Sequence, residues 1–246
     1  MKIFYSLLLV VFLSSCNSTV NNKKGIELRI LSSNLKAYCI DSVCSKNVLY
    51  TNNNYDNYFK KSTNIVRFKI INKSNSKFIA FIKGLPVSSK LRALFLEDLL
   101  IKETKTLKKI LPISIFEDCI DNPYDLLDST RILMYKKLGY KKTYKWYLKN
   151  GIINESLIYL EPNEVKYFEL YVNLPINSPI RSCTFEYFKL NKKKNYDVKL
   201  NFHSDTTNIK KYLTWSQLKN IEENNYKLYQ GTIISENSVP IVFVDE

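Results

Sequence analysis

The chain has 246 residues, of which 45% are hydrophobic and 24% are charged, and its formal net charge is +14 at pH 7. This composition excludes an intrinsically disordered chain, and the presence of only one long apolar run excludes a polytopic membrane protein. The five glycines and the single histidine argue against many enzyme classes. Glycine-rich phosphate loops and the H-E-x-x-H and G-x-S-x-G motifs are absent from the sequence.

The first sixteen residues have the features of an export signal. Met1 and Lys2 are followed by an apolar run over residues 3–13, which is about half as long as a membrane-spanning helix. Such a run is typical of the apolar region of a secretory signal peptide. It ends at Leu13-Ser14-Ser15-Cys16, which is an aliphatic residue, two small residues and a cysteine.

This ending resembles the lipobox of bacterial lipoproteins that carry a type II signal peptide. The resemblance covers residues 1–16 and implies that Cys16 becomes the mature N-terminus and carries thioether-linked and amide-linked lipid such as palmitate. Three acyl chains exceed what stable anchoring requires, because each buried methylene contributes about 0.8 kcal/mol. We therefore expect a lipoprotein that reaches its membrane partner through this lipid. The alternative is an ordinary signal peptide that contains a cysteine by chance.

The following residues indicate the location and the domain organisation. Asn17 is not Asp, the residue that favours inner-membrane retention in some bacteria with this pattern, so we expect the outer membrane. Residues 1–15 are then the signal peptide, residues 16–25 are the lipidated cysteine with a polar spacer, and residues 26–246 are a single mainly β domain. No repeat and no Pro/Gly-rich linker divides that domain, and we expect a helical insertion at about residues 118–150.

Three kinds of partner suit a basic surface: nucleic acid, anionic lipid and acidic glycan. An exported, membrane-tethered protein rarely meets nucleic acid, so we expect no nucleic-acid partner. Lys, Asn, Ile, Tyr and Phe are abundant whereas Gly, Arg, Ala and Pro are scarce, a profile typical of an AT-rich coding sequence. The AT-rich composition therefore explains the net positive charge without a binding function. The alternative is that the basic surface binds an envelope glycan or a protein partner.

Four cysteines remain once Cys16 is assigned to lipid: Cys39, Cys44, Cys119 and Cys183. An even number in an oxidising compartment predicts disulfides. Of the three pairings, we favour Cys39–Cys44 with Cys119–Cys183. Free thiols are an alternative, whereas C-x4-C without a second cysteine pair or paired histidines is a poor zinc signature. We expect no metal and no other cofactor.

Many segments after residue 25 alternate apolar and polar residues with the period of two expected of half-buried strands. They are residues 26–31, 35–40, 65–71, 77–82, 157–160, 165–174, 183–190, 196–202, 226–234 and 240–244. Polar turns at 72–76 and at 161–164, the second of which contains Pro162, predict two hairpins. Many short strands predict a mainly β fold of two packed antiparallel sheets. This pattern resembles the immunoglobulin-like sandwiches of exported bacterial lipoproteins.

Two segments break the alternation and predict helices. Residues 125–138 have acids early, lysines late and apolar residues at helical spacing. The sequence Thr214-Trp215-Ser216-Gln217 matches a capping box and predicts a short helix to about residue 223. Residues 91–110 suit either a helix or a strand that turns at 103–106, and we prefer the strand.

The most distinctive segment is residues 135–149, which combine six lysines with five aromatic residues. Aromatic faces stack on sugar rings, and ammonium groups attract phosphates and carboxylates. The segment is therefore a candidate site for acidic glycan or lipopolysaccharide. Its candidate residues are Lys136, Lys137, Tyr140, Lys141, Lys142, Tyr144, Lys145 and Trp146. The competing interpretation is that the aromatic rings are core side chains.

Two further groups have the composition of catalytic sites without the spacing. The acidic residues of 117–128 suit a glycan hydrolase only if two carboxylates face each other across a cleft, and no glycine permits a calcium loop there. They are Glu117, Asp118, Asp121, Asp125 and Asp128. His203 with the adjacent Ser204 and Asp205 is not a triad, because triad members meet through folding. We expect a surface or turn histidine, and we expect the acidic residues to be helix N-terminal acids with a solvated loop.

The sequence therefore predicts a lipid-anchored exported envelope protein with a non-enzymatic binding or assembly role, and no catalytic residue is assigned. One alternative is recognition of acidic glycan or lipopolysaccharide by residues 135–149. The other is an envelope glycan hydrolase that uses the acidic residues of 117–128.

Overall fold

The computed structural model describes residues 25–38, 62–83, 85, 92–116, 129–177 and 184–244. Over these residues the protein is mainly β, as the sequence predicts, with several antiparallel sheets and few helices. The lipobox and the cysteines Cys39, Cys44, Cys119 and Cys183 lie outside the described residues. Within those ranges, no helix is long and apolar enough to cross a membrane.

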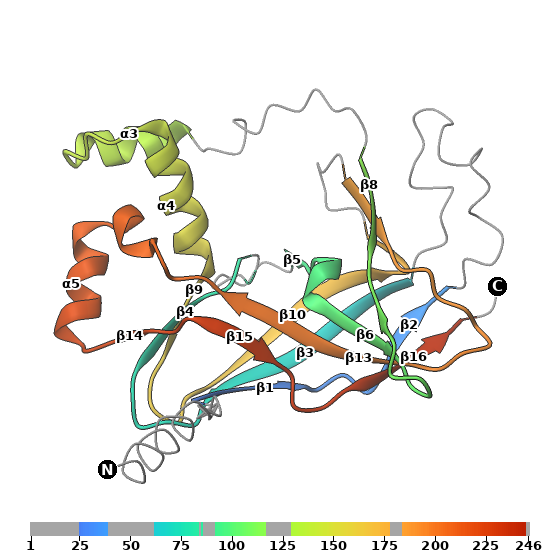
Figure 1. Ribbon diagram of the computed structural model, residues 1–246. Helices are drawn as coiled ribbons and strands as arrows, with labels where there is room; N and C mark the ends of the chain where they lie inside the picture. The colour runs from blue at the N-terminus through green and yellow to red at the C-terminus, as the bar shows by residue number, and fades with distance from the viewer. Residues whose placement is uncertain are drawn as a thin grey trace, which may run out of the picture.

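Four strands form the first sheet (Figure 1). Their order is β1 (Ile26–Ile30), β3 (Ser62–Asn72), β10 (Val165–Leu174) and β5 (Arg92–Ala93). Strands β1 and β10 flank β3 in antiparallel orientation, and β5 is parallel to β10. Alternation along β3 buries Val66, Phe68 and Ile70, while the residues between them are exposed or half-buried. Each strand therefore presents one apolar face to the core.

The second sheet packs against the first. Its order is β2 (Leu35–Ala37), β16 (Val239–Phe243), β13 (Tyr196–Ser204), β6 (Leu99–Glu103) and β7 (Lys109–Ile110), and β15 (Gly231–Ile234) pairs with β13. Buried side chains of both sheets share one core. In it the Phe68 ring lies 5.3 Å from Phe168 and 5.4 Å from Phe202, measured between ring centroids. Burial of these two apolar faces stabilises the two-layer arrangement.

Two smaller three-stranded sheets flank this pair. One has the order β11 (Ile176–Asn177), β12 (Thr184–Tyr187) and β8 (Ile113–Phe116). The other has the order β14 (Lys227–Leu228), β4 (Phe78–Phe81) and β9 (Leu157–Leu160). The second small sheet lies on the left in Figure 1, next to the helices.

The two predicted hairpins, over residues 65–82 and 157–174, are wrong, although their strands are confirmed. Strand β3 pairs with β10 and β4 pairs with β9, so the two segments run antiparallel along each other. Both segments bend together where they pass from the first sheet into the small sheet. Alternation identifies a strand and its buried face, but the polar turn in each segment redirects the strand instead of folding it back on itself.

The preference for strand over residues 91–110 is confirmed. Strands β6 and β7 pair antiparallel across a turn, and η2 (Leu96–Asp98) adds one 3₁₀ turn before β6. The strand predicted over 226–234 is divided into β14, which pairs with β4, and β15, which pairs with β13. The strand predicted over 183–190 is shortened to β12.

Helices gather at one end of the sheets, on the left in Figure 1, and we call this part the helical end. The structure describes α3 (Ser129–Lys137), α4 (Tyr144–Ser156), the 3₁₀ turn η4 (Ile209–Tyr212) and α5 (Trp215–Glu223) there. The predicted capping box is confirmed, because Thr214 accepts from the Gln217 N–H and Gln217 accepts from the Thr214 N–H.

The other helices agree with the sequence only in part. Helix α3 confirms the helix predicted over 125–138, although residues 125–128 lie outside the described residues. Helix α4 was not predicted as such. It begins after the N-cap Thr143 and passes directly into β9. Both helices overlap the expected insertion at about residues 118–150.

Candidate functional site

The helical end has its own aromatic core. Tyr135 from α3 and Trp146 and Tyr147 from α4 are buried, and Tyr140 packs against them. The Tyr140 ring stacks on Trp146 with 5.7 Å between centroids, and the Tyr135 ring meets Trp146 edge-on at 5.8 Å. The indole N–H of Trp146 donates to the backbone oxygen of Lys211 at 2.9 Å. The rings therefore hold α3, α4 and η4 together.

The turn between α3 and α4 is fixed by a Schellman motif. The N–H of Gly139 donates to the oxygen of Lys136, and the N–H of Tyr140 donates to the oxygen of Tyr135. Gly139 has φ +84°, a conformation that strongly favours glycine. The motif turns the Tyr140 ring back onto Tyr135, with 5.8 Å between centroids. This local sequence therefore places one ring of the aromatic core.

A chain of side-chain amides joins α4 to α5. The fully buried Asn150 donates to the backbone oxygen of Tyr212 at 2.7 Å. Asn154 donates to Oδ1 of Asn150 at 2.9 Å and to the hydroxyl oxygen of Tyr135 at 3.1 Å. Asn154 also accepts a hydrogen bond from Nε2 of Gln217. Because these bonds satisfy polar groups inside the helical end, they fix the relative positions of its helices.

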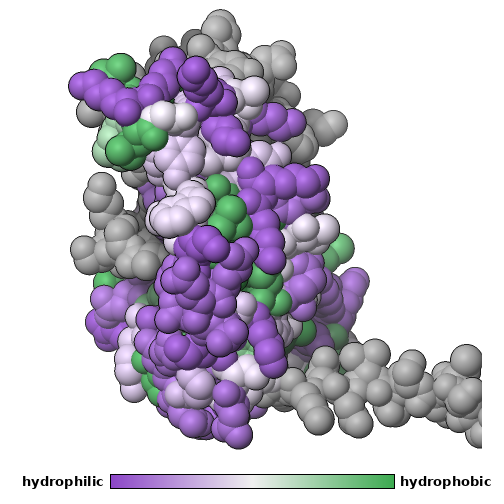
Figure 2. All heavy atoms as spheres, turned by 90° about the vertical axis from the view of Figure 1, so that its left-hand side faces the viewer, coloured by the Kyte–Doolittle hydropathy of each residue, from purple (hydrophilic) through white to green (hydrophobic). Residues whose placement is uncertain are grey.

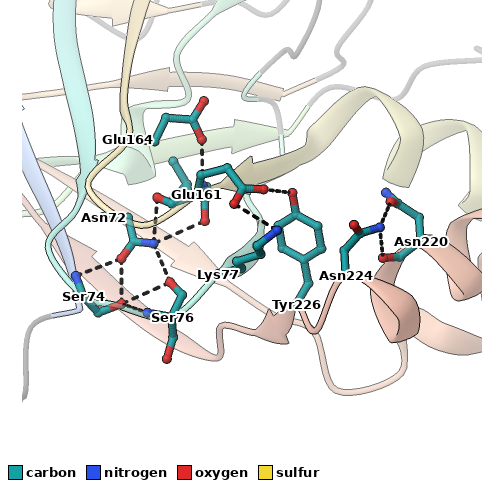
Figure 3. A network of polar contacts seen from close by, with 10 residues as sticks. Asn72, Ser74, Ser76, Lys77, Glu161, Glu164, Asn220, Asn224 and Tyr226 are labelled. Atoms are coloured by element: carbon teal, nitrogen blue, oxygen red, sulfur yellow. Dashed lines mark hydrogen bonds and ion pairs between the residues drawn. The ribbon is translucent and has the colours of Figure 1, made fainter.

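A second network joins the helical end to the sheets (Figure 3). The hydroxyl of Tyr226, which follows α5, donates to Oε1 of Glu161 at 2.5 Å, and Nζ of Lys77 lies 3.2 Å from Oε2. The hydrogen bond from Tyr226, together with Lys77, holds the pKa of Glu161 below its usual range. Burial and the bond to Glu161 raise the pKa of Tyr226 to about 12. At neutral pH a neutral phenol therefore donates to an ionised carboxylate.

Asn72 lies at the centre of the same bend (Figure 3), and its side chain is fully buried. Its Nδ2 donates to the backbone oxygens of Leu160 and Glu161 on one segment, at 3.2 and 3.0 Å, and of Ser76 on the other, at 2.7 Å. Its Oδ1 accepts from the backbone N–H and the hydroxyl of Ser74, at 3.0 and 2.8 Å. One side chain therefore ties both bent segments together.

The candidate glycan-binding residues fall into two groups. Trp146 is 5% exposed and Tyr140 is half-buried in the same aromatic core, while Tyr144 is 39% exposed. The covered indole of Trp146 leaves no face for a sugar to stack on. The lysines are all exposed: Lys136, Lys137, Lys141, Lys142 and Lys145. The segment therefore offers an anion its ammonium groups, while most of its rings serve the core.

Apolar side chains that the sequence analysis did not single out share this surface. Leu133, Met134, Leu138 and Trp215 are 55%, 50%, 65% and 68% exposed. Figure 2, which looks onto the helical end, shows apolar atoms in green among hydrophilic ones in purple near the top of the face. In the sequence Leu133 and Met134 follow Ile132 and look like core residues. We call these four residues and the five exposed lysines the lysine–apolar surface.

The remaining candidates lie elsewhere. The acidic residues of 117–128 are outside the described residues. His203 is exposed on β13, and its Nδ1 lies 3.3 Å from Oγ1 of Thr232. Hydrogen bonds from Thr207 lower the pKa of the nearby Asp205. In the part of the chain that the structure describes, no three His, Cys, Asp or Glu residues lie close enough together to hold a metal ion.

Asp98, in η2, has a strongly displaced pKa that sequence analysis did not anticipate. Burial raises the pKa from 3.8 to about 7. Repulsion from Glu97 and from Glu186 acts in the same direction, whereas a backbone hydrogen bond from Phe95 and the charge of Lys83 oppose it. Adjacent acids in a sequence usually indicate a solvated turn, so the partial burial of Asp98 has no sequence signal.

We expect Asp98→Asn to change the pH dependence of stability. The unfolded carboxyl loses its proton near pH 4 and the folded one near pH 7, so the folded state binds more protons in between. The free energy of unfolding therefore falls as pH rises through that window, by at most about 4 kcal/mol. Urea unfolding between pH 4 and 8 should show this fall in the wild type and a smaller one in Asp98→Asn. Glu223→Gln, at an exposed position on α5, should keep the wild-type profile. Equal profiles for Asp98→Asn and the wild type would contradict the raised pKa of the half-buried Asp98.

Comparison with known proteins gave no match. A scan against protein-family models, a search of the curated proteins and a search of the solved structures each found nothing similar.

Proposed function

We propose that the protein is a lipid-anchored exported protein that works by binding, not by catalysis, at the bacterial envelope. The observation that carries the proposal is the lipobox Leu13-Ser14-Ser15-Cys16 after a short apolar run. The polar spacer of residues 16–25 leads directly to β1 at Ile26. This spacing suits a folded domain held close to a bilayer by acyl chains on Cys16. The outer membrane is the proposed location, because Asn17 follows the cysteine.

A binding role is supported by the form of the helical end. Its outer surface combines exposed lysines with exposed apolar side chains, a combination typical of surfaces that contact other molecules. Its interior is fixed by aromatic rings and by amide hydrogen bonds, so little ordering accompanies binding. Hydrolysis by the acidic residues of 117–128 has no comparable support.

For the fold, we propose that the two packed sheets form a variant of the immunoglobulin-like sandwich. The shared core between β1-β3-β10 and β16-β13-β6 supports this. The parallel pairings of β5 with β10 and of β2 with β16 depart from a purely antiparallel sandwich. We further propose that Cys39–Cys44 and Cys119–Cys183 form disulfides after export.

Cys16→Ala tests the anchor. The wild type should incorporate labelled palmitate and partition into the detergent phase, and both properties should be lost completely in the variant because no other thiol lies in a lipobox. Cys39→Ala, which removes a cysteine outside the lipobox, should keep both. Label that persists in Cys16→Ala, or a wild type without label, would contradict lipid anchoring.

A further inference from the structure

Helix α3 exposes apolar side chains on the side opposite to its buried face. Ile132 and Tyr135 pack into the aromatic core, while Leu133 and Met134 are about half exposed. Successive residues of an α-helix are about 100° apart, so Leu133 and Met134 point away from the core. A surface helix ordinarily carries polar residues there. The outward apolar face therefore indicates contact with something apolar outside the chain.

Leu138 and Trp215 extend this face beyond α3. Leu138 lies in the turn that follows α3, one residue before Gly139. The N–H of Trp215 donates to the hydroxyl oxygen of Tyr140 at 3.1 Å, so α5 begins beside the same turn. The Trp215 indole is 68% exposed. The apolar side chains thus come from two separate segments of the chain that the folded helical end brings together.

Exposed lysines lie close in sequence to the apolar side chains of α3 and of the turn that follows it. No Asp or Glu occurs between residues 129 and 154. Five lysines of this segment are exposed, namely Lys136, Lys137, Lys141, Lys142 and Lys145. Lysines interleaved with Leu, Met and Trp are typical of surfaces that lie at the interface of anionic membranes. There the alkyl chains enter the acyl boundary, the indole sits at the headgroups, and the ammonium groups face the phosphates.

The short tether between Cys16 and the first described residue, Gly25, favours a membrane as the partner of the lysine–apolar surface. The oxygen of Gly25 accepts from the Lys73 N–H at 2.8 Å, and Gly25 lies against the Phe78 ring. Phe78 pairs with Lys227 in β14, the strand that follows α5, so Gly25 lies near the C-terminal end of α5, whereas α3 lies further away, at the top of Figure 1. The residues between Cys16 and Gly25 span at most about 30 Å. An acyl chain on Cys16 would therefore keep the folded domain, and with it the helical end, within reach of the bilayer.

We infer that the helical end docks on an anionic phospholipid bilayer through the lysine–apolar surface, as a second membrane contact beside the lipid on Cys16. The orientation of the docked domain rests on the proposed anchoring. An acidic glycan fits this surface less well, because Trp146 is covered and the exposed alkyl side chains offer a sugar no hydrogen bonds. Docking fixes which face of the sandwich points away from the membrane.

Trp215 provides a direct readout, because it is the exposed one of the two tryptophans. The full-length protein is purified in detergent and reconstituted into vesicles with brominated acyl chains. We expect phosphatidylglycerol vesicles to quench Trp215 fluorescence and to shift its emission to the blue, and phosphatidylcholine vesicles to do so weakly. Trp215→Phe should abolish the response, because Trp146 is enclosed in the aromatic core.

Neutralising three lysines should remove the preference for anionic lipid. Each lysine near an anionic bilayer strengthens binding about fivefold, so Lys136→Gln/Lys137→Gln/Lys141→Gln should weaken docking roughly 100-fold. Quenching in phosphatidylglycerol vesicles should then fall to the level in phosphatidylcholine. High salt should have the same effect on the wild type, which gives a second measurement that needs no substitution.

A matched control changes the same net charge elsewhere. Lys105→Gln/Lys192→Gln/Lys193→Gln alters exposed turns at the opposite end of the sheets and should leave quenching unchanged. Equal quenching in both vesicle types, or equal losses in both triple variants, would overturn the inference. So would a Trp215 response to soluble acidic polysaccharide without any response to vesicles. The intact mass of the same preparation reports acylation separately, so an unacylated chain that is still quenched rejects the anchor and keeps the docking surface.

Discussion

Replacing Asn72 by alanine should destabilise the protein by about 3–5 kcal/mol. The substitution removes the amide that donates to three backbone oxygens and accepts from Ser74. Each buried polar group left without a partner costs about 1–3 kcal/mol, and the side chain is fully buried. The melting temperature should fall by about 10 °C. Thermal and urea unfolding, followed by circular dichroism, measure the effect.

Two variants separate the hydrogen bonds from the bend itself. Asn75→Ala changes an exposed residue of the same turn and should alter stability by less than about 0.5 kcal/mol. Asn72→Asp keeps the size of the side chain but replaces the donor amide with an acceptor, so it should destabilise at least as much as Asn72→Ala. Wild-type stability in Asn72→Asp would show that the three donated bonds do not hold the bend.

Trp146→Ala should lower the free energy of unfolding by a similar amount, about 3–5 kcal/mol, because removal of a large buried ring leaves a cavity. The Trp146 ring contacts three tyrosine rings, and its N–H binds the backbone of Lys211. Loss of the indole should loosen α3 and η4 against α4. Near-ultraviolet circular dichroism and thermal unfolding should both report the change.

Trp215→Ala is the matched control, since it removes the same side chain from an exposed position. We expect a change of less than about 0.5 kcal/mol, together with loss of the vesicle response. Equal destabilisation by the two substitutions would contradict the distinction between the core tryptophan and the surface tryptophan.

The strands and one helix terminus were predictable from local sequence. Alternation of apolar and polar residues located β1, β3, β10 and β13, because the same alternation decides which face is buried. The capping box located the start of α5, because Thr214 and Gln217 satisfy each other's backbone groups within one turn. Signals that act over a few residues were therefore sufficient for these elements.

Strand pairing and α4 were not predictable in this way. Strand β10 pairs with β3, and β9 with β4, across roughly 80 to 110 residues of sequence, and the alternation in one strand says nothing about its neighbour. The bend also depends on Asn72, whose role exists only once Leu160 and Glu161 lie beside it. Helix α4 buries residues around much of its circumference, so its apolar residues do not form one stripe.

The candidate site was predicted in part. The lysines of residues 135–149 are exposed, as a binding surface requires, but the charge pattern could not distinguish a ring in the core from a ring on the surface. Trp146 is enclosed by residues from two other segments, whereas Trp215 is exposed beside Tyr140. Leu133 and Met134 look like core residues until the packing of Ile132 and Tyr135 shows which face of α3 is buried.

Mass spectrometry of the mature N-terminal peptide, isolated from native membranes, tests the central claim most directly. Lipid anchoring predicts a peptide that begins at Cys16 and carries a thioether-linked diacylglycerol and an amide-linked acyl chain. A chain that begins at Met1 with an unmodified Cys16 thiol would contradict it.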